Sequence, residues 1–214
     1  KHKNELHQIE ALLFGQAGLL DKDFEEDYPI LLSKEYQFYK SKYNLQSTNA
    51  NLFFLRMRPA NFPTVRLAQL AMLVVHSVHL FSKIKEIEEV ENVKKLLNVT
   101  ANDYWHYHYN FDELSTYKIK NVGVQMINNL IINTVIPILF AYGHYTKEHH
   151  FKDKALRWLT QLTAEKNSRI NGFLALQITI KNAFDSQALL QLKNKYCSKK
   201  RCLECAVGNK LLKT

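Results

Sequence analysis

Residues 64–85 read TVRLAQLAMLVVHSVHLFSKIK, and their apolar side chains recur at helical spacing. One broad face of a helix would collect Val65, Ala68, Leu70, Met72, Val75 and Val78. An apolar face this wide is typical of a helix that other elements cover. The stretch therefore predicts one long helix at the centre of a helical core.

A second apolar stretch, residues 122–142, reads VGVQMINNLIINTVIPILFAY and predicts another buried helix, bent at Pro137. Side-chain amides interrupt it at Gln125, Asn128, Asn129 and Asn133. Each unpaired amide in a hydrocarbon environment costs free energy, so this composition does not suit a membrane span. We expect a core helix and no membrane partner.

The composition supports an all-α fold. The chain has 214 residues, is 46% hydrophobic and 23% charged, and holds only 6 Gly and 4 Pro, which is too few for the turns of a sandwich or barrel. We predict a single multi-helix domain of about eight to ten helices over residues 1–214. It would comprise N-terminal helices (1–50), an Arg-Pro turn (51–63), a helical core (64–196) and a Cys/Lys-rich tail (197–214). A first residue of Lys predicts a fragment of a longer protein.

The net charge of +9 comes from 29 Lys and Arg against 20 Asp and Glu, and it favours acidic partners such as nucleic acid. Residues 193–214 hold seven Lys and Arg against Glu204 alone, which is +6 of the total. One hypothesis is a phosphate-binding patch that includes Lys199, Lys200 and Arg201. The alternative is a solvated C-terminus without a ligand.

Four polar residues flank the rigid turn between Pro59 and Pro63: Arg56, Arg58, Asn61 and Arg66. Guanidinium groups and the free amides of a helix N-terminus both favour phosphate or carboxylate, so the turn is a candidate anion cradle. Alternatively, Arg56 and Arg58 would pair internally with Glu35, Asp21 or Asp103.

The three cysteines follow the pattern Cys197-x4-Cys202-x2-Cys205. Two thiolates two residues apart suit a zinc knuckle, so a structural zinc is one interpretation, with a fourth ligand from His144, His149 or His150. Buried, unliganded thiols are the other interpretation. An iron–sulfur cluster usually takes four cysteines. The pattern is not a secreted disulfide framework and no signal peptide opens the chain, which predicts a cytoplasmic location.

The aromatic run 104–109, YWHYHY, predicts a short helix or loop with an N-cap at Thr100 or Asn102. Trp105, His106 and His108 could form a base-stacking platform, or the run could be core and rim of a helical bundle. His106 and His108 also suit acid–base chemistry, yet no Ser or Cys nucleophile lies nearby in sequence.

Three segments together carry a family resemblance: residues 10–18 (EALLFGQAG), 56–71 (RMRPANFPTVRLAQLA) and 186–197 (SQALLQLKNKYC) onward to Cys205. The chain resembles a bacterial family known as domain of unknown function 2851. The resemblance implies the C-terminal helical part of a longer protein, whose N-terminal part is similar to a restriction-endonuclease fold and would hold any catalytic carboxylates. The cysteine cluster is similar to the cluster loop of helix-hairpin-helix DNA glycosylases. It differs in its first spacing, four instead of six, and in lacking a fourth cysteine.

These observations predict a non-catalytic module that engages nucleic acid or scaffolds the N-terminal nuclease-like domain, since no catalytic motif lies within the chain. A second hypothesis is an enzyme or binding protein for a small anionic ligand between Arg56, Arg58, His106 and His108. A third is a purely structural domain that packs against its N-terminal partner.

Overall fold

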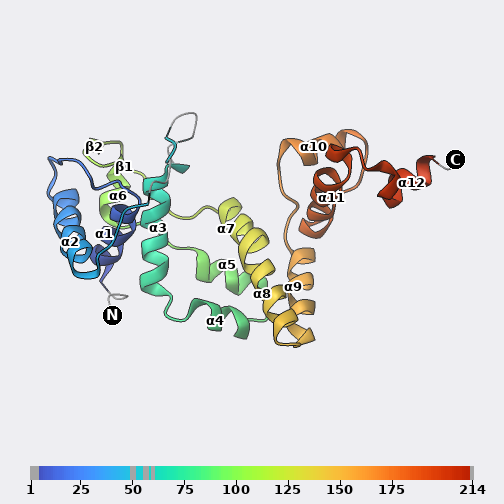
Figure 1. The fold of residues 1–214 in the computed structure, drawn as a ribbon, viewed down its shortest axis with the longest axis horizontal. Helices are drawn as coiled ribbons and strands as arrows, with labels where there is room; N and C mark the ends of the chain where they lie inside the picture. Colours follow the sequence, from blue (N-terminus) through green and yellow to red (C-terminus); the bar gives the residue numbers. More distant parts are fainter. Residues whose placement is uncertain (1–4, 49–51, 55–57, 59–60, 213–214) are drawn as a thin grey trace. The chain divides into compact units, whose positions relative to one another are not determined.

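The computed structural model describes residues 5–48, 52–54, 58 and 61–212, and within them the fold is almost entirely helical (Figure 1). The described strands are a short antiparallel pair, β1 (His108–Asn110) and β2 (Glu113–Leu114). The all-α prediction is therefore confirmed. The chain divides into two compact units, Lys1–Ile84 with Lys95–Val124 and Lys85–Lys94 with Gln125–Thr214. That residues 1–214 act as one domain stays a prediction.

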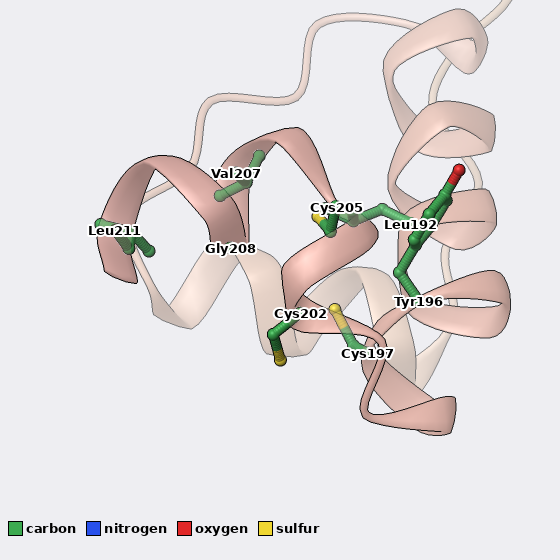
Figure 2. Close-up of a pocket in the computed structure, with 8 residues that line it drawn as sticks. All are labelled: Leu192, Tyr196, Cys197, Cys202, Cys205, Val207, Gly208 and Leu211. Carbon is green, nitrogen blue, oxygen red and sulfur yellow. The ribbon is translucent and has the colours of Figure 1, made fainter. Parts of the chain in front are cut away.

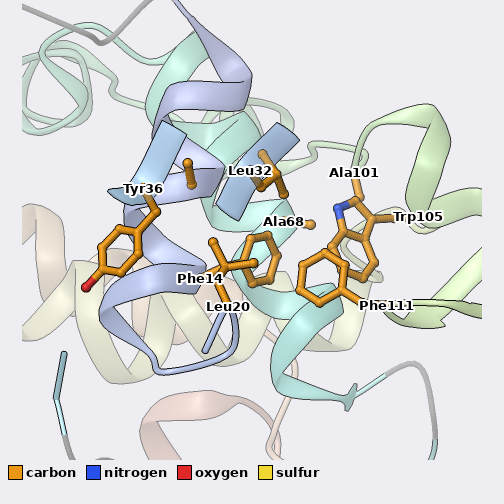
Figure 3. Close-up of a cluster of buried hydrophobic side chains, with 9 residues drawn as sticks. Phe14, Leu20, Leu32, Tyr36, Ala68, Ala101, Trp105 and Phe111 are labelled. Carbon is orange, nitrogen blue, oxygen red and sulfur yellow. The ribbon is translucent and has the colours of Figure 1, made fainter. Parts of the chain in front are cut away.

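The first unit is built on α1 (Leu6–Gln16), which packs against α2 (Asp27–Tyr43) and α3 (Pro63–His76). Its core joins these helices to α6 (Asp103–Tyr107) and to Phe111 (Figure 3). The rings of Phe14 and Trp105 stack with centroids 5.2 Å apart. Gly15 lets α1 approach α2 closely, because a Cβ there would lie 2.1 Å from the ring of Tyr36.

The single helix predicted over residues 64–85 is wrong, because α3 ends at His76 and α4 (Leu80–Glu86) begins at a 71° bend. The Ser77 N–H still donates to the Leu73 carbonyl, but His79 takes a positive φ of 58°. Neither Gly nor Pro marks this break, and a left-handed histidine is uncommon. Hydrophobic spacing alone therefore does not reveal this break.

The helical structure is also interrupted between α4 and α5 (Val90–Leu97). Side chains of α9 (His149–Gln161) donate hydrogen bonds to the backbone carbonyls at this interruption. Lys154 donates to the carbonyls of Lys85 and Ile87 at 2.6 and 3.1 Å, and the Trp158 indole donates to that of Glu88 at 2.8 Å. Tertiary hydrogen bonds thus replace the helical ones.

The predicted helix over 122–142 is present as α7 (Val124–Leu130), a π-helical turn (Ile131–Val135) and α8 (Ile136–Tyr145). In the π turn the Ile136 N–H bonds the Ile131 carbonyl, five residues back. Since Pro137 has no N–H and its ring would crowd the Asn133 carbonyl, the wider turn keeps the helix continuous across the proline.

This 22-residue helix is long and apolar enough to cross a membrane, and 33% of its most apolar stretch is buried. Gln125, Asn129 and Asn133 are exposed on its surface. The expectation that no membrane is a partner stays a prediction.

In the second unit α8 packs on α9, and α9 and α10 (Ser168–Ala175) both pack on α11 (Ala183–Lys195). The Asn182 side chain caps α11 by accepting from the Asp185 N–H at 3.1 Å. Asn102 caps α6, as predicted. The tail forms two short 3₁₀ turns, Cys197–Lys199 and Cys202–Glu204, and then α12 (Ala206–Leu212).

Candidate functional site

The arginine turn places one guanidinium in a defined environment. The Arg66 Nη1 donates to the Gln69 Oε1 at 2.8 Å, and its Nη2 donates to the Asn61 Oδ1 at 2.6 Å. The Arg66 Nε is buried without a hydrogen-bond partner, and burial lowers the Arg66 pKa from its ordinary value. Two neutral amides therefore hold a partly buried cation at the start of α3.

The internal pairing expected for this turn, of Arg56 and Arg58 with Glu35, Asp21 or Asp103, stays a prediction. Among the described residues, no Asp or Glu side chain forms an ion pair with Arg58 or Arg66. Arg58 is exposed, and its carbonyl accepts from the Asn61 N–H at 2.8 Å. Arg56 and Pro59 lie outside the described residues.

The predicted stacking platform is wrong, because all three of its residues are largely buried. Trp105 is in the core, and its indole donates to the Glu10 Oε1 at 3.2 Å. The His108 ring lies 3.0 Å from the Glu26 Oε1 and stacks on the Tyr104 ring at 4.0 Å. The side chain of His106 is only 12% exposed, and its Nδ1 lies 3.6 Å from Asp103.

Two neighbouring tyrosines are exposed instead. Tyr107 and Tyr117 have ring centroids 5.1 Å apart, with 47% and 56% of each residue exposed. Tyr107 belongs to the aromatic run, but Tyr117 follows the hairpin and only the fold brings it there. His106 lies beside Asp103 and His108 beside Glu26, and the ligand site expected between these histidines, Arg56 and Arg58 stays a prediction.

A buried carboxylate, missed in the sequence, joins three elements of the first unit. Glu10 is fully buried on α1 and accepts from the Tyr28 hydroxyl, from the Asn102 amide at 2.9 Å and from the Trp105 indole. No Lys or Arg faces it among the hydrogen bonds and ion pairs described. Burial, only partly offset by these donors, raises the Glu10 pKa to about 7. Burial and the neighbouring Glu10 also raise the Tyr28 pKa.

The three cysteines gather around one pocket between α11 and α12, together with Leu192, Tyr196, Val207, Gly208 and Leu211 (Figure 2). Gly208 is needed there, because a Cβ would lie 2.5 Å from the Cys202 carbonyl. Cys197 and Cys202 are exposed and Cys205 is buried.

The thiols do not converge as zinc ligands would. In Figure 2 the Cys202 side chain points away from those of Cys197 and Cys205. Across residues 5–48, 52–54, 58 and 61–212, no three His, Cys, Asp or Glu side chains are grouped so as to hold a metal ion. His144, His149 and His150 do not complete such a group. A structural zinc therefore stays a prediction that would need these side chains to rearrange.

The basic tail is partly neutralised. Arg201 pairs with Glu204, its Nε lying 3.0 Å from the Glu204 Oε1, and its guanidinium lies 5.6 Å from the centroid of the Tyr196 ring. Lys199 and Lys200 are exposed, and no hydrogen bond or ion pair is described for either side chain. Lys200 has a positive φ of 54°. Lys199 and Lys200, but not Arg201, are thus available to bind an anion.

The charge is concentrated in one segment. Residues 125–214 carry fourteen Lys and Arg against five Asp and Glu, a surplus that equals the net charge of the whole chain, +9. The arginine turn lies in the first unit and the lysine tail in the second. Each is therefore a separate candidate surface.

The comparison with protein families decides the relationship. The model of a family described as "Protein of unknown function (DUF2851)" matches residues 1–168. The chain belongs to this family. No curated protein and no solved structure matched it.

The DUF2851 match includes the arginine turn, Glu10 and the aromatic run, and residues 169–214, with all three cysteines, lie beyond it. The hydrogen-bond partners of Arg66 cannot be predicted from the sequence, although the spacing of arginines and prolines singles out the turn beside it. Glu10 gave no signal beyond one acidic residue among the apolar residues of a DUF2851 helix, since its donors Tyr28, Asn102 and Trp105 are up to 95 positions away.

Proposed function

We propose that the chain is a helical module that binds nucleic acid through backbone phosphates at its C-terminal basic segment. The observation that carries this proposal is the surplus of +9 on residues 125–214, with Lys193, Lys195, Lys199, Lys200 and Lys210 all exposed. Exposed lysines supply the sequence-independent attraction of nucleic-acid-binding proteins, because each phosphate contact releases counterions. A scaffolding role toward an N-terminal nuclease-like domain, and a cytoplasmic location, remain proposals beside it.

The fold supports lysine contacts that do not require base readout. The aromatic residues predicted for stacking are buried, and Tyr107 and Tyr117 belong to the other unit. Contacts limited to phosphates position a protein on nucleic acid but do not select a sequence. We therefore expect binding with little sequence preference and a strong dependence on salt.

The test is the salt dependence of affinity for a DNA duplex, measured by fluorescence anisotropy between low and moderate salt. The variant replaces Lys199 with Gln and Lys200 with Asn, because asparagine tolerates the left-handed backbone of position 200. If both lysines contact phosphate, the slope of log K against log salt should fall in magnitude by about 2.

The matched control is Lys34→Gln with Lys83→Gln, which removes the same charge from two exposed lysines of the first unit. Its slope should stay close to that of the unmodified chain. Equal losses in the two double variants would show that only net charge matters, and binding insensitive to salt would refute the proposal.

A further inference from the structure

The first unit contains two cations without a counter-charge: Arg66, partly buried in the first turn of α3, and Lys120, buried beside α3. Arg66 is held by Asn61 and Gln69, as described above. Lys120 is 3% exposed, and its Nζ donates to the carbonyls of His106 at 3.2 Å and Lys118 at 3.1 Å. The same Nζ lies 3.9 Å from the centroid of the Tyr109 ring.

The Gln69 side chain connects the Arg66 guanidinium with the backbone of Lys120. The Gln69 side chain accepts from Arg66 and donates to the Lys120 carbonyl at 3.2 Å. The Thr64 hydroxyl donates to the carbonyl of Tyr109, whose ring lies under Lys120. Side chains of α3, and β1 beside it, therefore hold both Arg66 and Lys120 in place.

The missing counter-charge is a property of the chain, because all 20 Asp and Glu residues lie within the described residues and none pairs with Arg66 or Lys120. Burying a cation is costly unless an anion compensates it. Desolvation accordingly lowers the pKa of both groups, and Lys118 lowers that of Lys120 further.

Arg66 also has donor capacity left for a ligand. A guanidinium has five N–H groups, and two of them are used by Asn61 and Gln69. One N–H of Nη1 and one N–H of Nη2 are therefore left for a ligand, whereas the unpartnered Nε is buried and not accessible to one. Lys120, in contrast, has its donors directed at two carbonyls and a ring, so it contributes charge and not a contact.

We propose that Arg66, oriented by Asn61 and Gln69 and supported by the field of Lys120, is a binding site for a phosphate group. Phosphate fits because its oxygens accept from the fork of a guanidinium, and its charge compensates that of Arg66. The site lies in the first unit, so it is independent of the basic tail proposed to bind nucleic acid.

The decisive variant is Asn61→Asp, which places a carboxylate of the same shape 2.6 Å from the Arg66 Nη2, where the amide oxygen now lies. This internal counter-charge should leave the fold intact and compete with phosphate. We expect inorganic phosphate to bind the unmodified chain saturably in equilibrium dialysis at constant ionic strength, and at least tenfold more weakly after Asn61→Asp.

Two further variants separate the site from general charge. Arg66→Met should also abolish phosphate binding, while Arg169→Met should not, although Arg169 is likewise held by an amide, that of Asn194 at 2.7 Å. Lys199→Gln with Lys200→Asn should leave phosphate binding unchanged. Equal phosphate binding by the unmodified chain and Asn61→Asp, or no binding by either, overturns the proposal.

The source of the phosphate is tested with an oligonucleotide that carries or lacks a 5′-phosphate. A preference for the phosphorylated strand that Asn61→Asp removes supports the site with a polynucleotide end as its ligand. Binding of inorganic phosphate without that preference supports it with a small phosphate compound.

Discussion

Glu10 shows how one residue can make the stability of the first unit depend on pH. Its carboxylate is fully buried and touches three neutral donors, so its charged form is held by hydrogen bonds without a cation. The pKa of about 7 means that the folded chain binds a proton there more tightly than the unfolded chain, whose value would be near 4.5. The favourable contribution is therefore fully present below pH 4.5 and is lost as the pH rises through 7.

Glu10→Gln should remove this dependence. The shift from 4.5 to about 7 corresponds to about 3 kcal/mol between the two ends of that range. We expect the free energy of unfolding of the unmodified chain to fall from pH 5 to pH 8 by an amount of this order, and that of the variant to change much less. Urea unfolding at several pH values measures both, with the exposed Glu89→Gln as control. Parallel pH curves for the chain and Glu10→Gln would rule out Glu10 as the source.

Residue-scale predictions from the sequence succeeded where the signal is local. The cap at Asn102 depends on one side chain and a backbone N–H two positions away. Arg66 was selected because prolines and arginines are close neighbours in the chain. The burial of His108, however, depends on Glu26, 82 positions away, and no local pattern records such a partner.

Elements show the same division. Helical spacing correctly predicts helical structure in residues 64–85 and 122–142, because apolar side chains recur there every three or four residues. It fails at residues 77–79, where the chain leaves the helix without Gly or Pro, and at residues 87–89, where α9 takes the backbone carbonyls. Both breaks result from tertiary contacts or an uncommon φ, and neither is visible in hydrophobic periodicity.

The cysteine tail yields a prediction about its thiols. Because Cys197 and Cys202 are exposed and Cys205 is buried, a thiol reagent should modify two thiols in the folded chain and the third only after denaturation. Colorimetric thiol counting before and after adding denaturant measures this. Protection of all three thiols until a chelator is added would instead indicate a zinc knuckle and contradict the arrangement described here.

For the whole molecule, composition was the informative level. Few glycines and prolines predicted the helical class, and the count of lysines located the positive charge. The division into two units was not predicted, since the chain has no Gly- or Pro-rich linker between them. The second unit includes residues 85–94, which lie in the sequence between the two parts of the first unit, and no change in composition marks this segment.

Because residues 85–94 belong to the second unit, more than one covalent connection joins the two units. The polypeptide passes from one to the other at three places, after residues 84, 94 and 124, so cutting a single peptide bond cannot set either unit loose. The side chains of Lys154 and Trp158 donate hydrogen bonds to backbone carbonyls of this segment. Separating the segment from them would leave a buried ammonium group and an indole N–H without hydrogen-bond partners. We expect melting in one calorimetric transition, with equal van't Hoff and calorimetric enthalpies. Two resolved transitions would show that each unit unfolds independently of the other.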